Sequence, residues 1–132
     1  MIKLNQLTPN IMVDDIDQTI AFYMESLGFS LAMRQPPEGA MDWAMLQRDE
    51  VVLMFQTRPS LSGELPLFEK RGLGGGLTFY VRMEGVRELF GQLGPEVRIV
   101  KGLNTTFYGA TEFVVEDPNG CVLTFAEFQS QD

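Results

Sequence analysis

The chain repeats one order of elements in its two halves, and this repeat constrains its fold more than any other feature. In the first half, an alternating segment at 7–13 leads into a helical pattern that Gly28 ends. In the second half, a strand-like segment at 77–81 leads into a helical pattern that Gly85 opens and Gly94-Pro95 ends. Short apolar segments follow each helix, so each half is predicted to be a βαβββ unit.

Apolar alternation predicts three further strands in each half, at 30–34, 42–47 and 51–56, and at 96–101, 111–115 and 121–127. Two βαβββ units predict an α+β fold: a curved mixed sheet with helices outside and a concave cleft inside. We expect one domain over 1–132. Module 1 is placed at about 4–57, a linker rich in Pro, Ser and Gly at about 58–75, and module 2 at about 76–128.

Strand periodicity assigns side chains to the two faces of the sheet. The face under the helices is predicted to hold Ile11, Val13, Trp43, Leu53, Phe55, Leu77, Phe79, Val81, Phe113, Val115, Leu123 and Phe125. The cleft face is predicted to hold, among others, Asp42, Ala44, Leu46, Met54, Tyr80, Arg82, Glu112 and Thr124. This second set is mixed in polarity, which is typical of a ligand cleft.

Composition excludes several classes of function. The chain of 132 residues has no histidine, so it cannot use a Ser-His-Asp arrangement or an imidazole metal ligand. A net charge of -8, with 10 Lys and Arg, disfavours nucleic acid as a partner. The single cysteine, Cys121, cannot form a disulfide within the chain. With no signal peptide and no long apolar run, we expect a cytoplasmic protein without a membrane partner.

Two stretches of the sequence resemble a known family. Val13-Asp14-Asp15-Ile16-Asp17, followed by Ala21-Phe22-Tyr23 and Leu27-Gly28-Phe29, resembles the opening of the vicinal oxygen chelate superfamily of glyoxalases, bleomycin-resistance proteins and dioxygenases. Tyr108-Gly109, Glu112-Phe113, Asp117-Pro118-Asn119-Gly120 and the segment 121–125 resemble its closing strands. The resemblance covers almost the whole chain. It implies paired βαβββ modules, a homodimer and a cleft between modules.

Catalytic members of that superfamily hold a divalent metal on four cleft-facing positions, mostly His and Glu. The resemblance places Thr8, Met54, Gly76 and Thr124 at these positions. Met and Gly offer no hard donor atom, and a threonine hydroxyl is a weak one. We therefore expect no metal and no cofactor, and we assign no catalytic residue. The resemblance then points to the metal-free bleomycin-resistance branch, whose small acidic dimers sequester a cationic drug.

The candidate ligand-binding residues are Asp42, Trp43, Met54, Tyr80, Arg82, Phe107, Tyr108, Glu112 and Thr124. Asp42 and Glu112 occupy matching places in the two halves and could hold a cationic group, or lie at strand ends in water. Trp43 fits core packing better than stacking on a ligand. Arg82 could pair with an acidic residue or bind an anionic ligand, in conflict with a cationic drug.

The resulting hypothesis is a metal-independent small-molecule binding protein that resembles bleomycin-resistance proteins and holds a cationic or aromatic ligand in a dimer cleft. The alternative is a glyoxalase- or dioxygenase-like lyase or isomerase, with Asp42 or Glu112 as general base. A third hypothesis is an accessory subunit that associates only with other proteins. A firmly bound divalent metal would favour the enzyme.

Overall fold

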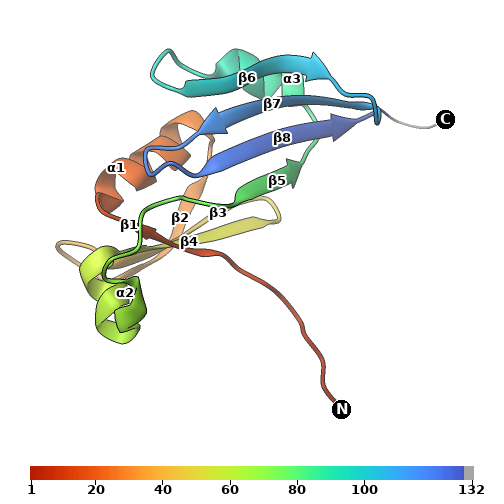
Figure 1. The fold of residues 1–132 in the computed structure, drawn as a ribbon. Helices are drawn as coiled ribbons and strands as arrows, with labels where there is room; N and C mark the ends of the chain where they lie inside the picture. The colour runs from red at the N-terminus through yellow and green to blue at the C-terminus, as the bar shows by residue number, and fades with distance from the viewer. Residues whose placement is uncertain (130–132) are drawn as a thin grey trace. The chain divides into compact units, whose positions relative to one another are not determined.

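The computed structural model describes residues 1–129, which form two four-stranded sheets, each with its own helix (Figure 1). The strand orders are β1-β4-β3-β2 and β5-β8-β7-β6, so the first and last strands of each half are neighbours. The chain divides into unit 1, residues 1–24 and 28–71, and unit 2, residues 25–27 and those from 72 onward. The predicted pair of βαβββ modules is confirmed.

Unit 1 contains the elements β1 (Asn10–Val13), α1 (Ile16–Ala21), β2 (Ser30–Gln35), β3 (Trp43–Arg48) and β4 (Val51–Thr57), and α1 runs on into a π-helical turn, η1 (Phe22–Ser26). Asp15 caps α1, because its Oδ1 accepts a hydrogen bond from the Gln18 backbone N–H at 3.0 Å. β1 pairs in parallel with β4, and the other neighbours are antiparallel. Glycine suits position 28, where φ is +73° and the helical segment ends.

The core of unit 1 is built on Tyr23, which is fully buried. Its ring lies 4.9 Å from the ring of Phe55 and 5.6 Å from that of Phe29, centroid to centroid. Ala44 and Leu46 are also fully buried, each with 0% exposure. Since Ala44 is opposite Phe55 in the β3–β4 register, both lie on the face that α1 covers.

The predicted phase of β3 is therefore wrong by one residue. Ala44 and Leu46 were expected on the cleft face, but they belong to the core. Trp43 was expected under the helix, but it lies opposite Gln56 and shares the other face with it. Asp42 is exposed and precedes the strand. Both alternating sets in β3 are apolar, so periodicity alone cannot choose between the two phases.

The segment predicted as a linker contains two further helices, α2 (Arg58–Glu64) and the 3-10 turn η2 (Pro66–Phe68). Pro59 lies in the first turn of α2, where a missing N–H costs nothing. The Gln56 amide donates to Ser60 Oγ at 2.9 Å and to Glu64 Oε1 at 3.1 Å, which fixes α2 to β4. Arg58 pairs with Asp14 at 2.9 Å. Both helices therefore belong to unit 1, which extends to Arg71.

Unit 2 contains β5 (Thr78–Arg82), α3 (Val86–Gln92), β6 (Arg98–Thr105), β7 (Ala110–Glu116) and β8 (Val122–Phe128). Its core stacks the ring of Phe113 on Phe125, with centroids 5.2 Å apart, and against Phe90 at the same distance. The turn at 117–120 is held by Asp117, whose Oδ1 accepts backbone N–H groups of Asn119 and Cys121 at 2.8 Å. Leu77, predicted under the helix, precedes β5 and is 54% exposed.

The first turn of α3 is capped from a distant strand. Gly85 stands at the N-cap position and has no side chain to offer. Instead, Glu127 of β8 accepts the backbone N–H groups of Gly85 and Val86, both at 3.0 Å. This carboxylate therefore lies on the α3 side of the sheet.

Candidate functional site

The face of the unit 2 sheet that points away from α3 carries the candidate site. Arg82 on β5 lies opposite Ala126 on β8, which lies opposite Glu112 on β7. In the neighbouring row, Tyr80 lies opposite Thr124, and Thr124 opposite Val114. Since residues paired across strands share a face, both rows lie on one surface.

Glu112 is the centre of this surface. It is only 8% exposed, and its Oε2 accepts hydrogen bonds from the hydroxyls of Tyr108, at 2.5 Å, and of Tyr80. The backbone around it is also fixed, because Asn104 Nδ2 donates to the Glu112 carbonyl at 3.1 Å. Within residues 1–129, no Lys or Arg forms an ion pair with Glu112. Its charge is thus met by two phenols and by no cation of the described chain.

The hydrogen bond to Glu112 also affects Tyr80. Desolvation of its hydroxyl, followed by the hydrogen bond to the carboxylate, raises the pKa of Tyr80 well above its usual value of about 10. The phenol therefore remains a donor at neutral pH. A phenol that donates to a carboxylate has more electron density in its ring, which strengthens attraction to a cation above the ring.

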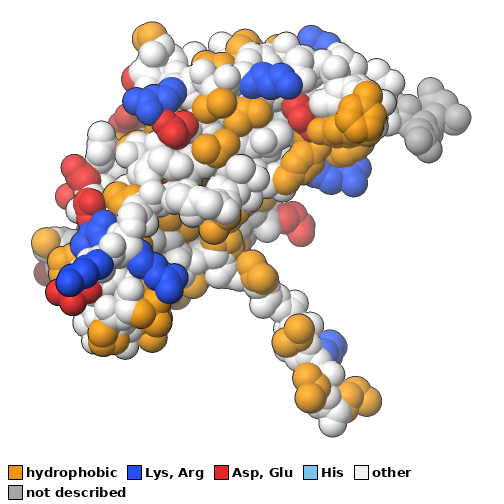
Figure 2. Space-filling view, viewed as in Figure 1, with side chains coloured by type: hydrophobic (Ala, Val, Ile, Leu, Met, Phe, Trp, Pro, Cys, Tyr) orange, Lys and Arg blue, Asp and Glu red, His pale blue; other side chains and the backbone are white. Residues whose placement is uncertain are grey.

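Aromatic rings surround Glu112. Tyr108 lies 5.0 Å from Phe107 and 6.1 Å from Phe128, between ring centroids. The Phe107 side chain is 99% exposed, and Tyr80 and Tyr108 are each 47% exposed. We call Tyr80, Phe107, Tyr108 and Phe128 the aromatic patch. Figure 2 shows hydrophobic side chains gathered over the end of β8 and the loop before β7, where this patch lies.

An open pocket of about 620 Å³ adjoins the aromatic patch and shares Phe128 with it. The full lining is Arg82, Met83, Glu84, Val86, Arg87, Thr111, Glu127, Phe128 and Gln129. The Arg82 guanidinium carbon stands 4.3 Å above the centre of the Phe128 ring. Besides Arg82 and Phe128, the lining includes Val86, Arg87 and Glu127 from the α3 side of the sheet.

Of the candidate residues, the structure brings five together in unit 2, namely Tyr80, Arg82, Phe107, Tyr108 and Glu112. Thr124 lies beside Tyr80 on the same face. The other candidates lie in unit 1. Met54 lies opposite Asn10 and Met45, Trp43 lies opposite Gln56, and Asp42 is exposed. Sequence reasoning missed Phe128, because the last strand was ended one residue early. Continuing its alternation through 122, 124 and 126 would have found it.

The family model described as "Glyoxalase/Bleomycin resistance protein/Dioxygenase superfamily" matches residues 3–125. The chain belongs to this superfamily. A "Bleomycin resistance protein" of Klebsiella pneumoniae is 40% identical to this superfamily member over 57 residues, which are 43% of this chain. The match spans 40% of the length of that relative.

Solved structures share the fold at low identity. One is a protein of unknown function from Agrobacterium tumefaciens str. C58, with 17% identity, a TM-score of 0.79 and 98% of each chain covered. Another is TioX from Micromonospora sp. ML1, with 22% identity, a TM-score of 0.74, and 95% of this chain and 99% of that chain covered. At such identities the likeness shows the fold of this superfamily member alone.

The donor atoms of this superfamily member do not fit the divalent metal of its catalytic relatives. From the sequence, the four metal-binding positions were expected to be occupied by Thr8, Met54, Gly76 and Thr124. Met54 pairs with Asn10 in the first half, and its equivalent Thr124 pairs with Tyr80 in the second, so Asn10 corresponds to Tyr80. Thr8, two residues before Asn10, therefore corresponds to Thr78 and not to Gly76. Gly76 lies outside β5, with φ at +83°. The corrected position again offers only a hydroxyl.

The other oxygen donors on these strands bind protein groups instead of facing a metal position. Glu127 is the one acidic residue among β1, β4, β5 and β8, and it caps α3 on the opposite face. Asn10 Nδ2 donates to Gln56 Oε1 at 2.9 Å, so these amides bind each other. Across residues 1–129, no group of three or more His, Cys, Asp or Glu is placed to hold a metal. We therefore derive no step through a metal.

In that same part of the chain, no helix combines the length and the apolar character that crossing a bilayer requires.

Proposed function

We propose that this superfamily member is a metal-independent binding protein that sequesters a small cationic or aromatic molecule on the aromatic patch, in the manner of bleomycin-resistance proteins. The observation that carries the proposal is the Glu112 carboxylate: 8% exposed, bound by two phenols, and without a cation from residues 1–129. A nearly buried charge is costly unless it is paired, and a cationic ligand would pair it.

The aromatic patch supports the same chemistry. Phe107 is almost fully exposed and Tyr80 and Tyr108 are about half exposed, which is unusual for large aromatic side chains gathered in one place. A planar cation could stack on them, and the negative charge of Glu112 beneath would add attraction. Binding without turnover is the expected action, because the site offers a charge and flat surfaces but no activated nucleophile.

The test is isothermal titration calorimetry with two probes, metal-free bleomycin and the planar cation ethidium. We expect the wild-type protein to bind at least one of them, and Glu112→Gln to weaken that binding by about tenfold or more, since a buried charge pair is lost. Glutamine keeps the shape and still accepts from both tyrosines.

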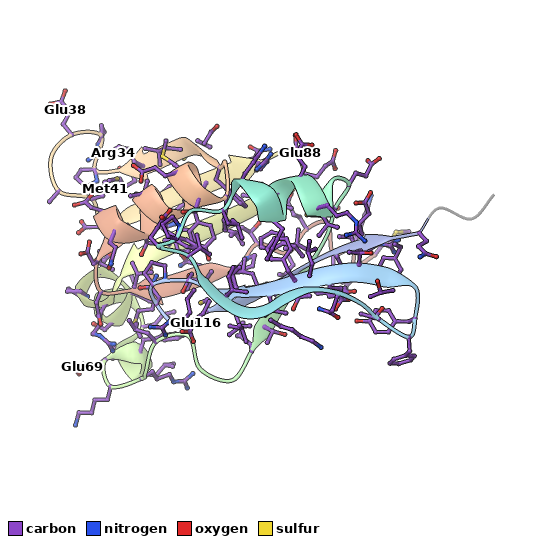
Figure 3. The ribbon with its side chains drawn as sticks, turned by 90° about the horizontal axis from the view of Figure 1, so that it is seen from above. Arg34, Glu38, Met41, Glu69, Glu88 and Glu116 are labelled. Carbon is purple, nitrogen blue, oxygen red and sulfur yellow. The ribbon has the colours of Figure 1, made fainter. Side chains whose placement is uncertain are left out.

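The matched control is Glu116→Gln. Glu116, labelled in Figure 3, lies on the same strand and face as Glu112, but it is already paired with Arg98. The affinity of the Glu116→Gln variant for the probes should equal that of the wild type. Equal binding by Glu112→Gln and wild type, or no binding of either probe, would overturn the proposal.

The proposal includes a homodimer in the cytoplasm that confers resistance to the drug it binds. Support for self-association comes from apolar side chains ahead of β1: Met1, Ile2, Leu4 and Leu7 are each at least 86% exposed. Such side chains are commonly covered by a partner. Light scattering after gel filtration should give twice the mass of 14.8 kDa. A monomer at micromolar concentration would remove the dimer from the proposal.

A further inference from the structure

We propose that the ligand of the aromatic patch is amphoteric, with an acidic group as well as its cationic or aromatic part, and that Arg82 binds the acidic group. This inference rests on the proposed function, whose site it extends. It assigns opposite roles to two residues of one row of the sheet, Arg82 for an anion and Glu112 for a cation.

The placement of the two charges is the first argument. Arg82 lies opposite Ala126, and Ala126 opposite Glu112, so the two charged residues are separated by two strand spacings. This puts their Cα atoms roughly 10 Å apart. They form no ion pair with each other, and Glu112 uses its Oε2 for the two tyrosines instead. A ligand that spans the row would meet both charges.

The contacts of Arg82 are the second argument. Its guanidinium stacks on Phe128, with 4.3 Å between the guanidinium carbon and the ring centre. Attraction of a guanidinium to a ring needs no hydrogen bond, so it leaves the five N–H donors of the group free. Those donors have no acceptor among residues 1–129, whereas Arg34 binds loop carbonyls of Pro36 and Gly39 (Figure 3). Arg82 is thus oriented and its edge is available for a carboxylate.

The pocket is the third argument. Arg82 lines the open pocket of about 620 Å³, so an acidic group has room beside it. Of the two carboxylates in the lining, Glu127 is engaged by the N–H groups of Gly85 and Val86. Glu84 is exposed to solvent, where its charge is screened. Arg87 also lines the pocket, but it stacks on no ring of the described residues and lies on α3, away from the row of Glu112.

The overall charge strengthens the case. With 18 Asp and Glu against 10 Lys and Arg, the chain repels anions in general. An acidic ligand group therefore needs a local cation, and an exposed arginine next to the patch would disfavour a ligand that is only cationic. One ligand that carries both charges removes this conflict.

The experiment compares aromatic zwitterions with their esters, which keep the cation and lose the anion. The probes are ciprofloxacin with its ethyl ester, titrated by calorimetry at neutral pH, and tryptophan with its methyl ester, titrated at pH 6 because the amine of this ester is only partly protonated at neutral pH. We expect the wild type to bind at least one acid about tenfold more tightly than its ester, as a charge-assisted hydrogen bond predicts. Arg82→Gln should remove this preference without weakening the ester. The control Arg71→Gln should keep it, because Arg71 also lies over a phenylalanine ring, that of Phe68, but does not line the pocket.

The outcomes separate the two proposals. If the wild type binds the ester as tightly as the acid, and Glu112→Gln weakens both, Arg82 has no such role and the proposed function stands. Arg82 is equally excluded as the anion-binding residue if Arg82→Gln keeps the preference or Arg71→Gln loses it. If neither the acids, the esters nor the cations bleomycin and ethidium bind, both proposals are overturned.

Discussion

Tyr80 and Tyr108 donate to the same carboxylate oxygen of Glu112, so the position of each hydroxyl constrains the other. Tyr80 comes from the edge strand β5 and Tyr108 from the loop before β7, and both donate to Glu112. Each phenol must remain protonated to donate, so the cluster is stable only where the tyrosines are neutral.

The raised pKa of Tyr80 gives a pH dependence with a definite sign. Its hydrogen bond contributes stability that is fully present below the unfolded value of about 10, and the contribution is lost as pH rises through the higher folded value. We expect Tyr80→Phe to lower the free energy of unfolding at pH 7 and to have a smaller effect at strongly alkaline pH. Urea unfolding at both pH values measures this. An effect that grows with pH would contradict the assignment.

Cys121 should be inert in the folded protein. Burial, followed by the nearby Asp117 charge, raises the pKa of its thiol to about 12, and the residue is 2% exposed. Iodoacetamide at pH 8 should leave the native thiol unmodified over hours and label it within minutes in urea, which mass spectrometry would detect. Rapid labelling of the native protein would show that the turn at 117–120 opens readily.

At the scale of elements, α3 depends on a strand for its beginning. We expect Glu127→Ala to destabilise the protein by about 1–2 kcal/mol, because two N–H groups of the first turn lose their acceptor. Glu116→Ala is the comparison, since it removes only an ion pair with the exposed Arg98, worth less than about 1 kcal/mol. Urea midpoints of the two variants would be compared. A smaller loss for Glu127→Ala than for Glu116→Ala would refute the capping role.

The elements also show what the sequence could and could not predict. The phases predicted for β5, β7 and β8 agree with their pairing in the sheet, so Tyr80, Arg82, Glu112 and Thr124 could be placed on one face. β3 is apolar on both faces, and its phase depends on pairing with β4. α2 contains Pro59 and Gly63 and buries Leu61, so its helical pattern is too weak to detect. The convergence of two hydroxyls on Glu112 depends on tertiary packing that periodicity does not describe.

For the whole molecule, the donor set makes a prediction about metals. Protein purified without chelators should contain less than about 0.1 equivalent of Mn, Fe, Co, Ni or Zn by elemental analysis, since weak hydroxyl donors do not retain such ions. Its melting temperature should not change with EDTA. A stoichiometric metal that EDTA removes with loss of stability would instead support the enzyme hypothesis.

The strand orders have a consequence for biosynthesis. In each sheet, the strand that comes last in its βαβββ unit is inserted next to the first, so β8 lies between β5 and β7. Until β8 has emerged from the ribosome, the edges of β5 and β7 that pair with it are free, and the N-terminus of α3 lacks its acceptor Glu127. Such a chain would be a natural client for chaperones, and a stop codon placed before Val122 should yield insoluble material.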